Sequence, residues 1–142
     1  MSYATQQQLI GRYGERLLLQ VADRADPPAG AIDAAIVAQA LADTDAVIDG
    51  YLAGRYVLPL ASMPPQLPPI AQAIAIYKLH VYEPEKKIAD EHQAAIADLV
   101  RIANGVIRLA VAGVEPTSSG ASGVETIDRE RDFTPENMTG FI

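Results

Sequence analysis

The chain of 142 residues contains no cysteine and no tryptophan. Without cysteine it can form neither disulfides nor thiolate metal sites, and it has no cysteine nucleophile. Its apolar segments are interrupted by charged residues or proline well short of the about 18 residues that a membrane-spanning helix needs, so we expect no such helix. The N-terminus has no basic residue followed by an apolar core, which predicts no signal peptide and a soluble, cytoplasmic product.

Basic residues are in the minority. The chain has 11 basic and 18 acidic residues and a formal net charge of −7. Nucleic-acid-binding modules usually show a basic patch, so this balance argues against one. Six of the acids and two of the bases lie in residues 112–142, which therefore carry a net charge of −4.

Catalytic motifs are also missing. The sequence has no P-loop, no Gly-x-Ser-x-Gly and no Gly-x-Gly-x-x-Gly. Its two histidines, His80 and His92, lie outside any HExxH pattern, and a metal site would need carboxylates from Glu83, Glu85 or Asp90 as well. Structural histidines are the favoured reading. We therefore expect no metal, no cofactor and no enzymatic activity.

The pattern that is present is helical. With 49% apolar residues the chain suits one globular domain. Apolar residues recur at three- and four-residue steps, and prolines and glycines punctuate them. The sequence predicts an all-α bundle of four or five helices with at most one short strand or hairpin. The expected helices cover residues 5–13, 14–22, 31–55, 69–82 and 84–104.

The central expected helix, residues 31–55, leaves one choice open. Asp43, Thr44 and Asp45 could end one helix and cap another, but we favour a single long helix, kinked there if at all. Asp43, Asp45 and Asp49 form an acidic group that a solvated helix face explains. The short join at residues 82–84 predicts an antiparallel hairpin of the last two helices.

The segments between and after the helices are less defined. Residues 56–60 could pair as an edge strand, and the proline-rich residues 63–69 should be stiff and polyproline-like. This apolar loop either packs on its own domain or serves as a contact arm for a neighbouring subunit. Residues 106–111 could form a short strand or a last helical turn.

The composition changes at residue 112, which divides a helical domain (residues 1–111) from a C-terminal arm (residues 112–142). Residues 117–123 have the composition of a flexible linker. A stretch of alternating charge (residues 128–132) follows, and after it come apolar anchors on an otherwise polar tail. This order is typical of segments that fold onto a partner. The alternative is that the arm folds back onto its own domain.

Four stretches of the chain resemble one protein family. The run DGYLAGRYVLPL (residues 49–60) is similar to the signature of the small neck proteins of Mu-like tailed bacteriophages, the head–tail adaptors. The likeness extends to YATQQQL (3–9), IAIYKL (74–79) and RDFTPENMTGF (131–141). It covers nearly the whole chain, and the order and spacing of the four stretches carry it.

The resemblance implies a structural virion protein, made in the host cytoplasm, that joins the portal after DNA packaging. It implies a homo-oligomeric ring, usually twelve-fold, that meets head-closure or tail-side proteins and lets DNA through its lumen without sequence-specific binding. An acidic lumen would help because it repels phosphate.

From this reading we place two sets of contact residues. Subunit contacts are expected at Tyr51, Arg55, Tyr56, Leu58 and Leu60. For Arg55 three possibilities stay open, namely stacking on an aromatic ring, bridging to a carboxylate, and a surface position. Docking to the portal or to a neighbour is expected at Arg129, Arg131, Phe133, Met138, Phe141 and Ile142.

Two other classes remain open. One is a head-closure or tail-terminator protein, which would be richer in β structure. The other is a small helical enzyme or regulator unrelated to virions, which a stabilising small ligand would reveal.

Overall fold

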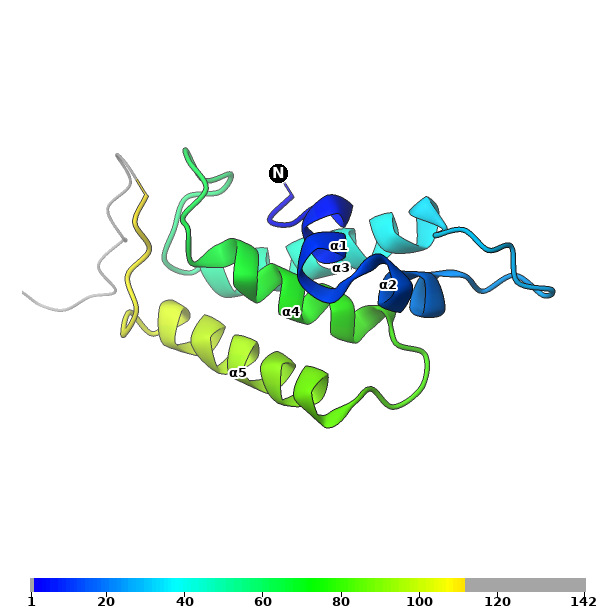
Figure 1. Ribbon diagram of the computed structural model, residues 1–142. Helices are drawn as coiled ribbons and strands as arrows, with labels where there is room; N and C mark the ends of the chain where they lie inside the picture. The colour runs from blue at the N-terminus through cyan, green and yellow to red at the C-terminus, as the bar shows by residue number, and fades with distance from the viewer. Residues whose placement is uncertain (1, 112–142) are drawn as a thin grey trace, which may run out of the picture.

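The computed structural model describes residues 2–111, which form five helices (Figure 1). They are α1 (Gln6–Tyr13), α2 (Glu15–Ala22), α3 (Ala34–Leu52), α4 (Leu67–Leu79) and α5 (Lys86–Ala103). The all-α prediction is confirmed, since this part of the chain contains helices and no strands. None of the five helices is both long and apolar enough to cross a membrane.

Helix α4 is the centre of the bundle. It packs against both α3 and α5, and successive helices of this trio run in opposite directions (Figure 1). Residues on all sides of α4 are buried, and its side chains enter both apolar clusters of the protein. Ile74 belongs to the cluster that includes Tyr3 and Leu109, and Ile76 to the one that includes Leu9 and Leu18. Because α4 and α5 pack against each other and run in opposite directions, the predicted antiparallel hairpin of the last two helices is confirmed.

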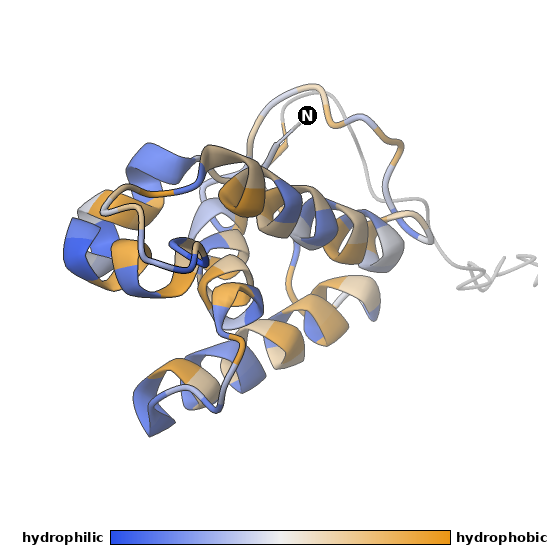
Figure 2. Cartoon of the chain, turned by 90° about the vertical axis from the view of Figure 1, so that its right-hand side faces the viewer, coloured by the Kyte–Doolittle hydropathy of each residue, from blue (hydrophilic) through white to orange (hydrophobic). Residues whose placement is uncertain are grey.

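The outer helices show one apolar face each, as Figure 2 shows for the bundle seen from one end. In α1 and α2 the fully buried side chains are Leu9, Leu18 and Ala22, while the polar exposed ones are Gln7, Gln8, Arg12, Glu15, Arg16 and Gln20. This amphipathic pattern holds the short helices on the bundle through burial, since helices this short are marginal on their own.

The helix ends follow the capping chemistry of the sequence. Thr5 and Gln8 make a reciprocal capping box at the start of α1, with N···O distances of 3.0 and 3.2 Å. Asp33 caps α3 by accepting from the backbone N–H of Ala35 (2.9 Å). Gly14, at a φ of 88°, makes the break between α1 and α2 that the sequence predicts.

Helix α3 is one continuous helix, as favoured from the sequence. Thr44 does not cap a new helix. Its side chain is fully buried, and its hydroxyl donates to the carbonyl of Ala40 (2.8 Å), one turn back. The helix is shorter than expected at both ends, because Asp33 starts it and the chain turns away after Leu52.

Several expected boundaries are wrong. Helix α4 starts at Leu67 rather than at residue 69, because Pro68 and Pro69 fit a first turn, where no backbone N–H is needed. The same helix ends at Leu79 rather than near residue 82, and α5 starts at Lys86 rather than at residue 84.

Neither of the two stretches that could have formed a short strand does so in residues 2–111. Residues 56–60 are not a strand, since the N–H of Tyr56 donates to the carbonyl of Leu52 (2.8 Å) and continues the end of α3 as a turn. Residues 106–111 form neither a strand nor a helical turn. They run as a coil whose Leu109 is buried in the core.

The N-terminal segment is tied to α3 by a tyrosine. The backbone N–H of Tyr3 donates to Asp45 (2.9 Å), and its hydroxyl donates to Asp49. The Tyr3 side chain is buried. Burial and the carboxylate of Asp49 raise the pKa of the Tyr3 hydroxyl well above its usual range. Two of the three aspartates expected on a solvated face therefore have a structural task.

We expect Tyr3→Phe to lower the free energy of unfolding by about 1–2 kcal/mol, because it removes a hydrogen bond to a charged group and leaves Asp49 half-buried without it. Urea denaturation measures the change. Tyr82→Phe is the matched control, since Tyr82 is 88% exposed. Equal stability losses in the two variants would contradict this role of Tyr3.

Candidate functional site

The stretch expected to carry subunit contacts lies at the end of α3 and in the loop after it. The structure divides its five residues into two groups. Tyr56 and Leu60 are buried in their own domain, at 3% and 4% exposure, while Tyr51, Arg55 and Leu58 are half-buried. Their contact with a neighbouring subunit stays a prediction. In this stretch, Val57 is the side chain most available to a neighbouring subunit, because it is 64% exposed.

Tyr56 links this loop to the last described segment. Its hydroxyl accepts a hydrogen bond from the backbone N–H of Leu109 (3.0 Å), across 53 residues of sequence. Leu109 has no strand or helix partner, so this buried bond satisfies a donor that would otherwise be costly. The hydroxyl of Tyr56 therefore helps to hold the segment around Leu109 against the end of α3.

Arg55 makes a second link at the same place. Its Nε donates to the carbonyl of Ala103 (3.3 Å), the last residue of α5. The positive charge of Arg55 also interacts favourably with the negative, C-terminal end of the α5 dipole. Gly105, at a φ of 78°, lies against the guanidinium, and a Cβ on it would come within 2.6 Å of the Arg55 Cζ. The glycine is thus needed for its backbone conformation, and a larger residue would also have to push the end of the Arg55 side chain aside.

We call the end of the bundle formed by residues 53–66 and 99–111 the basic end. These two segments contain three arginines and no aspartate or glutamate. Besides Arg55 they carry Arg101, which pairs with Asp98 (2.9 Å), and the exposed Arg108. The exposed large apolar side chains here are Val57, Val100 and Val106, at 64%, 41% and 74%.

The opposite end is formed by residues 23–33 and 80–85, and we call it the acidic end (Figure 1). These loops hold five carboxylates and one arginine. Asp23 organises the first loop by accepting from the backbone N–H groups of Gly30 (2.8 Å) and Ala29 (3.1 Å), which lowers its pKa. The Arg24 guanidinium donates a hydrogen bond to the carbonyl of Leu79 (3.1 Å), the last residue of α4, and so caps the C-terminus of that helix.

The acidic end also contains a hollow and two exposed apolar side chains. Tyr82 is 88% exposed and Val81 65%. The hollow has a volume of about 420 Å³. Its walls combine apolar and charged groups from α2 and the two loops: Gln20, Val21, Asp23, Arg24, His80, Val81, Tyr82 and Glu83.

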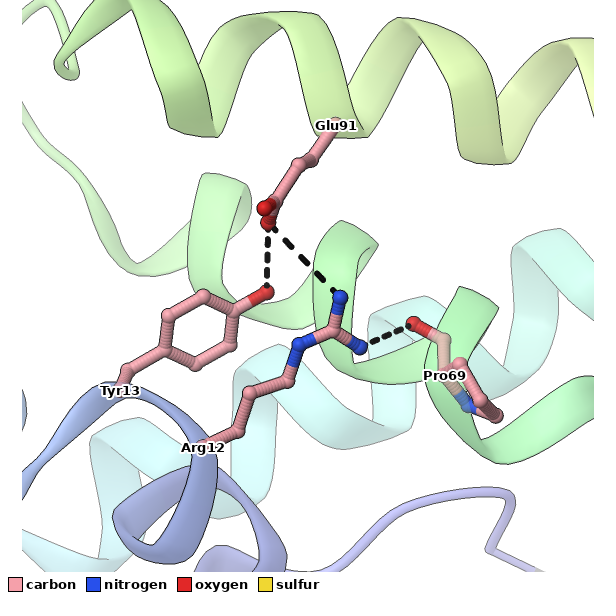
Figure 3. Close-up of polar contacts among 4 residues, drawn as sticks. All are labelled: Arg12, Tyr13, Pro69 and Glu91. Carbon is pink, nitrogen blue, oxygen red and sulfur yellow. Dashed lines mark hydrogen bonds and ion pairs between the residues drawn. The ribbon is translucent and has the colours of Figure 1, made fainter.

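A polar cluster joins α1 to α4 and α5 (Figure 3). Glu91 accepts a hydrogen bond from the Tyr13 hydroxyl (3.2 Å) and lies 3.9 Å from the Arg12 guanidinium. Arg12 also donates to the carbonyl of Pro69 (3.1 Å). Burial raises the pKa of Tyr13 to about 12; Arg12 acts against this rise and Glu91 adds to it. Helical periodicity alone places Glu91 beside Lys87, four residues earlier on the same helix. It gives no sign of contacts with α1, so this cluster was not predicted from the sequence.

Both histidines make contacts within the bundle. The imidazole of His92 stacks on Tyr77, with ring centroids 3.9 Å apart and planes 10° apart. Partial burial, with Lys78 nearby, lowers the pKa of His92. A ring nitrogen of His80 lies 2.7 Å from the carbonyl of Ile76. Within residues 2–111 no group of three histidine or carboxylate side chains could hold a metal ion.

The second set of expected contact residues, from Arg129 to Ile142, lies outside residues 2–111, as does the proposed linker. Their docking role stays a prediction. The boundary of the helical domain at residue 111 likewise stays a prediction.

The fold defines an all-α protein whose polar side chains mostly tie its helices and loops together. A family model described as Bacteriophage Mu, Gp36, matches residues 3–126. The chain is 36% identical over 142 residues to Gene product J of Escherichia phage Mu, covering 100% of both chains. It is 35% identical over 140 residues to the Mu-like prophage FluMu protein gp36 of Haemophilus influenzae, covering 99% of this chain and 98% of that one. The chain therefore belongs to the Bacteriophage Mu Gp36 family, and the expected membership of a Mu-like phage family is confirmed.

We expect Gly105→Ala to lower the free energy of unfolding by at least about 1–2 kcal/mol, because alanine at positive φ is strained and its Cβ would displace Arg55. Gly50→Ala is the matched control. It lies within α3 with nothing near its Cβ position, so it should stabilise by about 0.5–1 kcal/mol. Thermal and urea unfolding measure both. A neutral Gly105→Ala would contradict the close packing of Arg55 on this turn.

The raised pKa of Tyr13 predicts a pH dependence. The ordinary pKa of tyrosine is 10.0, and the pKa of Tyr13 in the folded protein is about 12. Between pH 10 and about pH 12 the folded protein therefore keeps the Tyr13 proton, whereas the unfolded chain releases it. Its contribution to stability is therefore complete below pH 10 and is lost as pH rises toward 12. We expect Tyr13→Phe to lose less stability than the wild type over this range, and Tyr82→Phe to match the wild type. Parallel stability curves for all three proteins would refute this.

Proposed function

We propose that this protein is a structural component of the phage neck, a head–tail adaptor that forms a ring between the portal and the head-closure or tail-side proteins. In this proposal it is not an enzyme. The observation that carries it is that the chain matches Mu-type phage proteins over its whole length. The four neck-like stretches found in the sequence agree with the same role.

The structure adds two supports. First, the stretch with the strongest neck-protein resemblance, residues 49–60, forms the end of α3 and a loop fixed by Tyr56 and Arg55 at one end of the bundle. A rigid loop at an end suits repeated contacts with other subunits, since little ordering is needed on binding. Second, the four most exposed large apolar side chains lie at the two ends, where assembly partners could cover them.

The role in DNA passage follows from charge. The acidic balance of the chain, net −7, disfavours tight binding of phosphate. In a ring whose lumen DNA crosses, this would let the genome slide without sequence-specific binding. The described helices, with no strand among them, favour an adaptor over a β-rich head-closure or tail-terminator protein.

The proposal is tested by affinity purification from host cells producing the phage, using an N-terminal tag on a spacer. We expect the full chain to recover a portal-sized oligomeric phage protein, identified by mass spectrometry. A variant lacking residues 133–142 should lose that protein and reduce the yield of virions, because it lacks the apolar anchors of the expected docking arm.

The control is Lys86→Ala with Asp90→Ala, which removes an exposed pair on α5 whose charges are 3.9 Å apart. It should keep both portal recovery and virion yield. Equal melting temperatures establish that the shortened chain folds. Recovery of host metabolic proteins alone, or an unchanged virion yield after the deletion, would contradict the adaptor role.

A further inference from the structure

We propose that copies of this chain bind one another end to end, with the basic end of one copy seated on the acidic end of the next. The inference rests on the proposed function, because it names the surfaces that would build the homo-oligomer. The occupant of each end is thus a second copy of this chain.

The first observation is where apolar side chains are exposed. Among residues 2–111 six large apolar side chains are exposed, and the four most exposed are Val57, Val81, Tyr82 and Val106, at 64–88%. Two lie at each end. Of the other two, Val100 also belongs to the basic end and is 41% exposed, while Tyr77 is only 36% exposed and is covered on one face by His92. Exposure of this kind is therefore concentrated on the two surfaces that an end-to-end contact would bury.

The second observation is charge. The basic end has three arginines and no carboxylate, in a chain whose net charge is −7. The acidic end has five carboxylates against Arg24. Asp98 partly offsets Arg101, which leaves Arg108 as the exposed cation best placed to meet a partner. Opposite potentials of this kind steer two surfaces together and set their orientation.

The third observation is shape. The hollow of about 420 Å³ at the acidic end has Val21, Val81 and Tyr82 in its walls, with Glu83 beside them. This space can receive an aliphatic side chain, and its carboxylate can meet an arginine. The basic end offers both kinds of group in Val106 and Arg108, two residues apart in the sequence.

Charge also selects the symmetry. If the contact is made end to end, two-fold symmetry would bring like ends together and set carboxylates against carboxylates, or arginines against arginines. Joining unlike ends avoids this repulsion and gives a heterologous contact that repeats in one direction. Such a contact closes into a ring when the rotation between copies allows it.

Because the natural chain has no cysteine, disulfide trapping can test this contact cleanly. We would introduce Tyr82→Cys and Val106→Cys together in one full-length chain. This variant would be oxidised in two settings: as purified protein at high concentration, and inside phage-producing cells. Both positions are highly exposed, so the fold should tolerate the changes. The expected result is a ladder of covalent dimers, trimers and larger species, weakened by Arg108→Glu and by salt.

The matched control pairs Tyr82→Cys with Ala97→Cys, an exposed position in the middle of α5. It should give no ladder beyond dimers. A third variant combines Val106→Cys with Phe133→Cys. A disulfide between these two positions within one chain would mean that the chain's own C-terminal arm occupies the basic end. A ladder no stronger than the control in both settings, or efficient cross-linking within the chain, would overturn the proposal.

The outcome is separable from that of the proposed function. Portal recovery without a ladder would leave the adaptor role standing and reject this contact. A ladder without portal recovery would keep the contact and reject the adaptor role.

Discussion

The burial of α4 between α3 and α5 is the constraint on which the rest of the structure depends. Each fully buried leucine or isoleucine stabilises the fold by about 1.5–3 kcal/mol, and α4 supplies several of them to both apolar clusters. Since α4 has little polar surface of its own, the surrounding helices must provide the protein's exterior. The exposed charged and polar groups are consequently found at the ends of the bundle and on the outer helices.

Polar links then fix the segments that packing alone would leave loose. Tyr3 ties the N-terminal segment to Asp45 and Asp49 of α3, and Tyr56 ties residues 104–111 to the turn after α3. Each link satisfies a backbone or carboxylate group at low exposure, where an unmet partner would be costly. The Tyr56 link thereby helps to hold the basic end of the bundle in a defined shape.

The sequence allowed the helices, the continuous α3 and the Thr5 cap to be predicted, because periodicity and capping are local properties. Helix boundaries near prolines were wrong, since Pro68 and Pro69 fit a first turn as well as a loop. The links made by Arg12, Tyr13 and Glu91 could not be predicted, because they join residues 78 and 79 positions apart. For the same reason the burial of Tyr56 and Leu60 depends on packing that no local pattern encodes.

The most direct test of the account is to locate the protein on the virion. Antibodies raised against the full chain can be applied to purified particles and detected by gold labelling in the electron microscope. The account predicts label at one site per particle, the junction of head and tail. Label spread over the capsid or along the tail shaft, or virions without label, would contradict it.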